Sequence, residues 1–280
     1  MRWGVSSLRW VRPLKGILCI FIKDADHQVI DLQIDGIRSD SCTTGHRFMA
    51  PEFFTVKDFD DYKLKLRNAF VILDNRERSE IILNDANNLA FANGLDLIND
   101  DALLEEVSGL VEWPVTLLGK VDKAFLDLPS EVLRASMKEH QKFFSLKNPK
   151  TEKIERFITV ANIESADNGA TILEGNQKVL YARLSDAKFF WENDLRLIQK
   201  DGLDTWLEKL KNVTFHNKLG SQADKVLRIS ALTKKLVGPL ACDGEAAVNG
   251  ANICKSDLTS EMVYELSLIH ISEPTRLRSI

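Results

Sequence analysis

The hydrophobic pattern of this 280-residue chain changes along its length, and the change divides the chain into two regions. Up to about residue 195, short alternating apolar runs are mixed with stretches in which apolar residues recur at helical spacing. From Asp204 onward the helical spacing dominates, as in the stripe formed by Trp206, Leu207 and Leu210. Alternation is typical of strands, and a spacing of three to four residues is typical of helices. We therefore predict an α+β fold, with a mixed α/β domain over residues 1–195 and an all-helical domain over residues 196–265.

The expected strands lie in the first region. Residues 16–22 are apolar and β-branched, which favours a buried strand, and residues 28–34 alternate so that Ile30, Leu32 and Ile34 share one face. The polar residues between these two runs predict a hairpin turn. Further strands are expected at residues 114–118, 142–146 and 156–162, the last two paired around a turn at residues 148–150.

Helices are expected where capping residues precede helical spacing. Ser130 is expected to cap a helix that runs to about His140, and Ser221 begins another helix in a capping-box arrangement with Asp224. Gly94 stands where a helix commonly ends. The other predicted helices cover residues 58–68, 76–93, 101–107 and 174–194.

Charge is distributed unevenly along the chain. The net charge of the whole chain is −4, but residues 133–228 contain 17 basic and 13 acidic side chains, an excess of 17 − 13 = +4. A basic excess favours binding of a polyanion such as a nucleic acid. A solvated surface of mixed charge would show the same small excess, so this alternative stays open.

The sequence argues against several classes of site. The four cysteines form no Cys-x-x-Cys pair and have no accompanying histidine cluster, which argues against a structural zinc site and a disulfide framework. No phosphate-binding loop, dinucleotide fingerprint, nucleophile elbow or zinc-helix motif is present. The apolar run at residues 17–22 is too short for a signal-peptide core or a membrane span. We therefore assign no catalytic residue, no metal ligand and no cofactor to this chain, and we expect no membrane association.

One segment places cations beside aromatic rings. Two lysines, a histidine and an amide lie directly before Phe143 and Phe144. Cations neutralise phosphates and aromatic rings stack on unpaired bases, so the segment is a candidate nucleic-acid contact. The alternative is that both phenylalanines are buried and the lysines are solvated, which is common. The candidate residues are Lys138, His140, Gln141 and Lys142, with Arg156 on the expected partner strand.

Two further segments contain candidate contacts. His46 and Arg47 follow a polar stretch and offer donors to a phosphate or a carboxylate, although a turn that leads into a strand explains them equally well. On the helix expected over residues 174–194, Arg183 and Lys188 are candidate RNA contacts. We expect the aromatic residues of that helix to form a buried seam, with Phe190 and Trp191 on one side together with Ala187.

Several longer segments of the chain, taken in their order along the sequence, form one pattern. They include LPSEVLRASMKEHQKFF at residues 128–144, RFITVANIE at residues 156–164 and EGNQKVLYARLSDAKFFWENDL at residues 174–195. GLVEWPV lies upstream, and LEKLKNVTFHNKLGS lies downstream. In these segments and in their order the chain resembles the β subunit of bacterial two-subunit glycyl-tRNA synthetase. The resemblance extends over residues 1 to about 265, and the shared order makes it specific.

This resemblance implies that two kinds of subunit have different roles. A separate α subunit would activate glycine with ATP and Mg²⁺, and the β subunit would contribute tRNA binding to a cytoplasmic complex of two α and two β subunits. The resemblance further implies an editing-type-like domain followed by an HD-like helical domain, which is truncated here. It also implies that Met1 is internal to the family sequence and that an anticodon-binding domain is missing.

The HD-like domain is expected to lack hydrolytic activity. A hydrolase of that fold uses a His-Asp doublet with further ligands, whereas this chain has no such doublet and reads Cys254-Lys255-Ser256-Asp257 at the matching place. Residues 266–280 fit no pattern and resemble a translated sequencing adaptor, so they receive no role.

Two other functions stay open. An editing-type hydrolase of mischarged tRNA would need a water-activating group such as His46 or His140. Glycine is the smallest amino acid, so exclusion of larger ones by size makes editing less necessary. A purely structural scaffold would bind the α subunit tightly and make little contact with tRNA.

Overall fold

The computed structural model describes residues 2, 8–12, 14–23 and 26–265. The chain forms two compact units. Unit 1 comprises residues 1–119, 142–150 and 156–175, and unit 2 comprises residues 120–141, 151–155 and 176–280. Helices and small sheets are both present, so the predicted α+β class is confirmed. Residues 266–280, predicted to be an artefactual tail, lie outside the described residues.

Unit 1 contains most of the strands. Its N-terminal part has β1 (Ile17–Leu18), β2 (Ile20–Lys23), β3 (Asp26–Val29), β4 (Gln33–Ile34), β5 (Ile37–Asp40), β6 (Cys42–Thr44), β7 (Phe53–Thr55) and helix α1 (Phe59–Asn68). Its remaining elements are α2 (Asn75–Ala92), β8 (Asp96–Leu97), α3 (Asp101–Leu110), β9 (Val115–Lys120), β10 (Phe144–Lys147) and β11 (Ile154–Ala161). The last residue of β9 and the first two residues of β11 belong to unit 2.

Unit 2 is mainly helical. It contains the 3₁₀ turn η1 (Lys123–Phe125), α4 (Ser130–Ala135), the π-helical segment η2 (Ser136–Gln141) and most of the long helix α5 (Ala170–Asp201). These are followed by α6 (Asp204–Lys209), η3 (Leu210–Asn212), β12 (Thr214–His216), β13 (Gly220–Ser221), α7 (Gln222–Leu240), α8 (Gly244–Ile253), η4 (Ser256–Thr259) and α9 (Glu261–Glu265). The boundary predicted at residue 195 falls within α5 and stays a prediction.

The N-terminal hairpin is confirmed, but the predicted burial of its first strand is wrong. β2 and β3 pair antiparallel from Ile20 opposite Val29 to Lys23 opposite Asp26. The expected single strand divides at Cys19, because β1 pairs with β5 instead. The β2–β3 sheet has only two strands, so Phe21 remains 54% exposed.

The second expected strand is also interrupted. Ser39 accepts a hydrogen bond from the backbone N–H of Leu32 and donates one to the carbonyl of Ile30, in place of a continuous ladder. Ile30 and Leu32, which were expected to share one face of this strand with Ile34, lie outside the β-strands and are 40% and 39% exposed.

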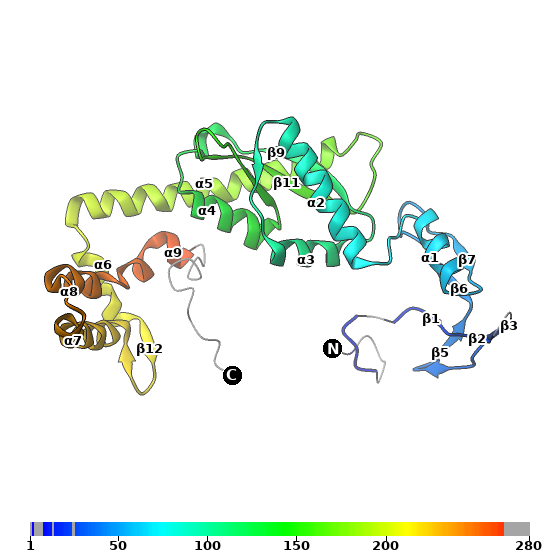
Figure 1. Ribbon diagram of the computed structural model, residues 1–280, viewed down its shortest axis with the longest axis horizontal. Helices are drawn as coiled ribbons and strands as arrows, with labels where there is room; N and C mark the ends of the chain where they lie inside the picture. Colours follow the sequence, from blue (N-terminus) through cyan, green and yellow to red (C-terminus); the bar gives the residue numbers. More distant parts are fainter. Residues whose placement is uncertain (1, 3–7, 13, 24–25, 266–280) are drawn as a thin grey trace. The chain divides into compact units, whose positions relative to one another are not determined.

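The main core of unit 1 lies between two helices and a four-stranded sheet of order β8-β10-β11-β9. Figure 1 shows α2 and α3 side by side over this sheet. Apolar side chains from both helices and from β10 and β11 form one buried cluster, which includes Ile82, Ala86, Ala90, Leu103, Val107, Phe144, Leu146 and Ile158. The predicted pairing of the strands around residues 148–150 is confirmed by the sheet order.

The helix ends of unit 1 follow the expected capping chemistry. Asp58 caps α1 by accepting from the N–H of Asp61, and Asp100 caps α3 by accepting from the N–H of Leu103. Gly94 has a φ of 65°, which glycine adopts without steric strain after the end of α2. The helices predicted at residues 58–68, 76–93 and 101–107 are therefore confirmed.

The helix predicted from Ser130 differs in two respects. Pro129 holds the N-cap position, its carbonyl accepts from Val132 and Leu133, and no side chain caps this helix. Ser130 is thus the first helical residue and not the cap. The α-helix ends at Ala135, and residues 136–141 form a π-helix that ends before Lys142, whose φ is 57°.

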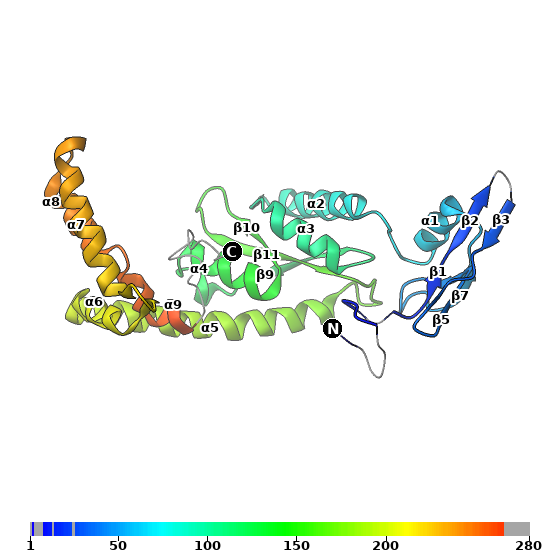
Figure 2. The same ribbon diagram turned by 90° about the horizontal axis from the view of Figure 1, so that it is seen from below.

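Unit 2 confirms the capping box and corrects the prediction of purely helical structure after Asp204. The Ser221 side chain accepts from the N–H of Asp224, and the Asp224 carboxylate accepts from the N–H of Ser221. These hydrogen bonds hold the pKa of Asp224 below its ordinary value. Directly before this box, Thr214–His216 pairs with Gly220–Ser221 in a short hairpin. After this hairpin in the chain come α7 and α8, which Figure 2 shows side by side.

The packing around Gly119 generates a stability prediction. A Cβ at Gly119 would lie 2.1 Å from Cζ of Phe157, which is fully buried. We expect Gly119→Ala to lower the free energy of unfolding by roughly 1–3 kcal/mol, because the ring must shift within a packed core.

Gly109→Ala is the matched control, since a Cβ there meets nothing within 4 Å on the exposed side of α3. This change should raise the free energy of unfolding by about 0.5–1 kcal/mol. Urea denaturation measures both, and equal stability of the two variants would contradict the packing argument.

Candidate functional site

The candidate residues at the end of η2 differ in how accessible they are. His140 is exposed, whereas Lys138 and Gln141 are partly buried. Lys142 forms an ion pair of 2.9 Å between its Nζ and Oε1 of Glu106. The charge of Lys142 therefore already has a partner, which weakens its attraction for a phosphate.

The two phenylalanines beside these residues are core residues. Phe143 is 3% exposed and Phe144 is 4% exposed. The ring of Phe143 stacks on Phe157 with centroids 4.6 Å apart and planes 11° apart. Of the two alternatives left open for this segment, burial of Phe143 and Phe144 is confirmed, because their rings already pack inside the protein.

The candidates in the N-terminal part and on β11 have distinct surroundings. His46 is only 1% exposed, and its Nδ1 accepts hydrogen bonds from the backbone N–H groups of Phe48 and Met49. These bonds give His46 a structural role in the turn. Arg47 is exposed, and its guanidinium lies 5.3 Å from the centroid of the Phe48 ring. Arg156 on β11 is partly buried.

Helix α5 carries two candidates with different roles. Arg183 is exposed and makes no hydrogen bond or ion pair with the rest of the described chain. Lys188 donates from Nζ to the carbonyl of Ala124 at 3.1 Å and lies 3.8 Å from Oε1 of Glu192. On the face expected to form the seam, Ala187 is buried and Phe190 and Trp191 are partly buried, while Phe189 is 59% exposed and meets Phe190 edge-on.

The candidates do not gather in a single unit. Unit 1 holds His46, Arg47, Lys142 and Arg156, and unit 2 holds Lys138, His140, Gln141, Arg183 and Lys188. Each unit therefore presents its own set of basic side chains, and the sequence does not reveal this division.

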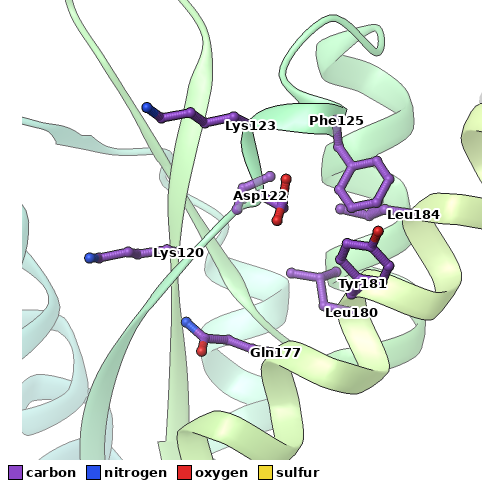
Figure 3. A pocket seen from close by; sticks show the side chains of 9 residues that line it. Lys120, Asp122, Lys123, Phe125, Gln177, Leu180, Tyr181 and Leu184 are labelled. Carbon is purple, nitrogen blue, oxygen red and sulfur yellow. The ribbon is translucent and has the colours of Figure 1, made fainter.

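Unit 2 also has a cavity that the sequence did not indicate. It lies between the segment from Lys120 to Phe125 and the part of α5 from Gln177 to Leu184, and its volume is about 490 Å³ (Figure 3). This volume falls in the range of pockets that hold a small organic ligand. The two segments are more than fifty residues apart, so no local spacing links them.

The cavity wall combines rings, aliphatic side chains and polar groups. Phe125 and Tyr181 meet edge to face with centroids 5.1 Å apart. Leu180 and Leu184 are buried at 2% and 1% exposure and supply aliphatic surface. The carboxylate of Asp122 accepts from the N–H of Ala124 at 2.8 Å and thereby caps η1.

Two carboxylates that do not line the cavity, one in each unit, make local hydrogen bonds. A hydrogen bond from Lys153 keeps the pKa of Asp127 below its ordinary value, and the two side chains are 2.8 Å apart. At the start of α5, hydrogen bonds from Ser165 and Thr171 hold the pKa of Asp167 well below its usual range. Both carboxylates are therefore charged at neutral pH and act as local anchors.

The two histidines expected as water-activating groups, His46 and His140, do not line the cavity of unit 2. In the ranges that the structure describes, no group of three or more His, Cys, Asp or Glu side chains is arranged to hold a metal ion. Asp257 lies partly buried in η4, next to the buried Ser256.

Among the described helices, none is both long enough and apolar enough to cross a bilayer.

Comparison with known proteins gives consistent results. Residues 1–270 match the family described as glycyl-tRNA synthetase beta subunit. The chain is 59% identical over 266 residues to the glycine–tRNA ligase beta subunit of Ruegeria sp. (strain TM1040), which covers 95% of this chain and 39% of that relative. It is 57% identical to the corresponding subunit of Dinoroseobacter shibae and 55% identical to that of Paracoccus denitrificans, each over 95% of this chain. The chain thus spans about two fifths of the length of these relatives.

The Lys188 contact generates a prediction about η1, the turn that lines the cavity. Lys188→Met keeps the aliphatic stem but removes the donor to the carbonyl of Ala124. We expect faster amide hydrogen exchange at residues 123–126 and a decrease in stability of about 1 kcal/mol or less.

Lys200→Met, at an exposed position near the end of the same helix, is the control and should leave the exchange of those amides unchanged. Identical exchange in the two variants would show that Lys188 does not hold the turn.

Proposed function

Because the chain belongs to the glycyl-tRNA synthetase beta-subunit family, we propose that it serves the ATP-dependent charging of tRNA with glycine. In this proposal the chain contributes tRNA binding and association with the α subunit. The observation that supports it most is the family match, which covers residues 1–270.

The adenylate-forming site lies elsewhere in this proposal. The sequence has no phosphate-binding loop or other nucleotide motif. ATP and Mg²⁺ would accordingly be used by the α subunit within a cytoplasmic complex of two α and two β subunits.

The two predicted domains have separate roles in this proposal. Residues 1–195 correspond to an editing-type-like domain, and residues 196–265 correspond to the start of an HD-like domain. Asp257 is the one acidic residue of the Cys254–Asp257 segment, and a hydrolytic metal centre needs several nitrogen and oxygen ligands. The HD-like part would therefore serve RNA or subunit contacts and not hydrolysis.

Binding of tRNA would depend on exposed cations. Arg183 is the strongest candidate, because it is exposed on α5 and has no partner elsewhere in the described structure. The partly buried Lys138 and the exposed His140 lie on η2 in the same unit. Such side chains neutralise phosphates and release counterions, so the affinity should fall steeply as salt is added.

A scaffold function is a second candidate, and one observation favours it. The side chains of Leu232, Leu236 and Leu240, each four residues from the next on α7, are 58%, 44% and 67% exposed. An apolar helical stripe of this kind is typical of a protein interface. Capture of the purified α subunit together with a gel shift on tRNA separates the two functions, since a scaffold would bind the α subunit and leave tRNA unshifted.

Charge reversal tests the tRNA-binding proposal. In the complete complex, Arg183→Glu combined with Lys138→Glu should weaken tRNA affinity roughly tenfold or more at moderate salt. The slope of log affinity against log salt should decrease by about 0.7–0.9 for each phosphate that the variant no longer neutralises. Glycine-dependent ATP–pyrophosphate exchange should stay near the wild-type rate, because activation takes place on the α subunit.

Lys63→Glu is the matched control, since Lys63 is exposed on α1 and is not a candidate contact. It should retain wild-type tRNA affinity. If the double variant bound tRNA as tightly as this control, the choice of contact residues would be rejected.

A further inference from the structure

The cavity of unit 2 has the features of a receptor for a planar ring. Tyr181 is 52% exposed, while the Phe125 ring against which it lies is only 2% exposed. Phe125 thus holds Tyr181 from the protein side, and much of the tyrosine remains open to a ligand. A ring fixed in this way loses little conformational freedom when another ring stacks on it.

The polar groups of the cavity match the edge of a nucleobase. Gln177 offers both a donor and an acceptor, and Asp122 offers carboxylate lone pairs beyond the one that accepts from Ala124. Figure 3 shows Asp122 and Gln177 on either side of the group formed by Tyr181 and Leu180. A base presents N–H donors and ring acceptors along one edge, so side chains of both kinds can read it.

Two lysines near the cavity could contact the phosphates of a bound nucleotide. Lys120 and Lys123 are exposed, and within the ranges that the structure describes neither has an ion-pair partner. In Figure 3 their amino groups extend away from the ring cluster. They would therefore meet phosphates that flank an inserted base and not the base itself. Because the Asp122 carboxylate and the buried leucines disfavour a free anion inside the cavity, phosphate alone is a poor occupant.

We propose that this cavity binds one unpaired nucleotide of RNA, with its base stacked on Tyr181 and its flanking phosphates near Lys120 and Lys123. The proposal rests on the proposed function, since it identifies where a bound tRNA would place an unstacked base. Bases inside a duplex are stacked on their neighbours and cannot enter, so the site selects single-stranded segments.

Binding of a short RNA tests the site directly. The probe is a single-stranded RNA decamer with 2-aminopurine at its centre, whose fluorescence falls when the base stacks on an aromatic ring. The same decamer paired with its complement should bind more weakly. Tyr181→Ala should reduce affinity for the single strand roughly five- to hundredfold, whereas Tyr181→Phe, which keeps the ring, should stay within about threefold of the wild type.

Two further variants control for general effects. Tyr264→Ala removes a tyrosine that is 79% exposed on α9 and does not line the cavity, so it should bind like the wild type. Gln177→Ala changes the polar wall without touching the Phe125 ring and should also weaken binding. Circular dichroism of each variant confirms folding, and Gln177→Ala still tests the site if Tyr181→Ala does not fold.

The outcomes separate this proposal from the proposed function. If tRNA binds with a steep salt dependence but Tyr181→Ala and Gln177→Ala behave like Tyr264→Ala, the cavity is not the nucleotide site and the proposed function stands. If the decamer binds in a Tyr181-dependent way while tRNA does not bind, the cavity proposal stands and the proposed function fails. Equal affinity for the single strand and the duplex would overturn the cavity proposal.

Discussion

The ring of Phe157 occupies the space that a side chain on Gly119 would need, and this packing fixes β9 beside β11. A Cβ at Gly119 would come within 2.1 Å of the ring, so the close approach requires glycine. Phe157 is in turn held by its stack on Phe143. Lys120 follows Gly119 directly, and the N–H of Val121 donates to the carbonyl of Glu155 at 3.0 Å. The position of Gly119 near the end of β9 is therefore set by packing in the core of unit 1.

Burial decides which aromatic rings serve the core and which remain accessible to a partner. Phe143, Phe144 and Phe157 lie next to basic residues in the sequence, but all three are buried. Tyr181 is the exposed ring that accompanies lysines in the cavity of unit 2, and it comes from a different segment of the chain. Charge and aromatic content in one stretch of sequence thus do not identify a nucleic-acid contact, because burial decides which rings are available.

Local chemistry made much of the fold predictable from the sequence. The Ser221 capping box, Gly94 and the turn at residues 148–150 all mark elements that the structure contains. The errors have tertiary causes: β3 ends at Val29, the Ser39 side chain hydrogen-bonds the backbone of Ile30 and Leu32, and β2 pairs with β3 alone among the described strands, so apolar residues there stay exposed. The cavity was not predictable, because Lys120–Phe125 and Gln177–Leu184 are joined only by the fold and neither segment has a recognisable motif.

The central claim is that RNA is bound by exposed side chains of unit 2, while the rings of β10 and β11 serve only the core. Hydrogen–deuterium exchange of the complete complex, with and without tRNA, tests this claim most directly. We predict that tRNA slows exchange over residues 120–125 and 177–184 and leaves residues 143–147 and 154–161 unchanged. Slower exchange confined to residues 143–147 and 154–161, with tRNA bound and no change at the cavity segments, would contradict the account.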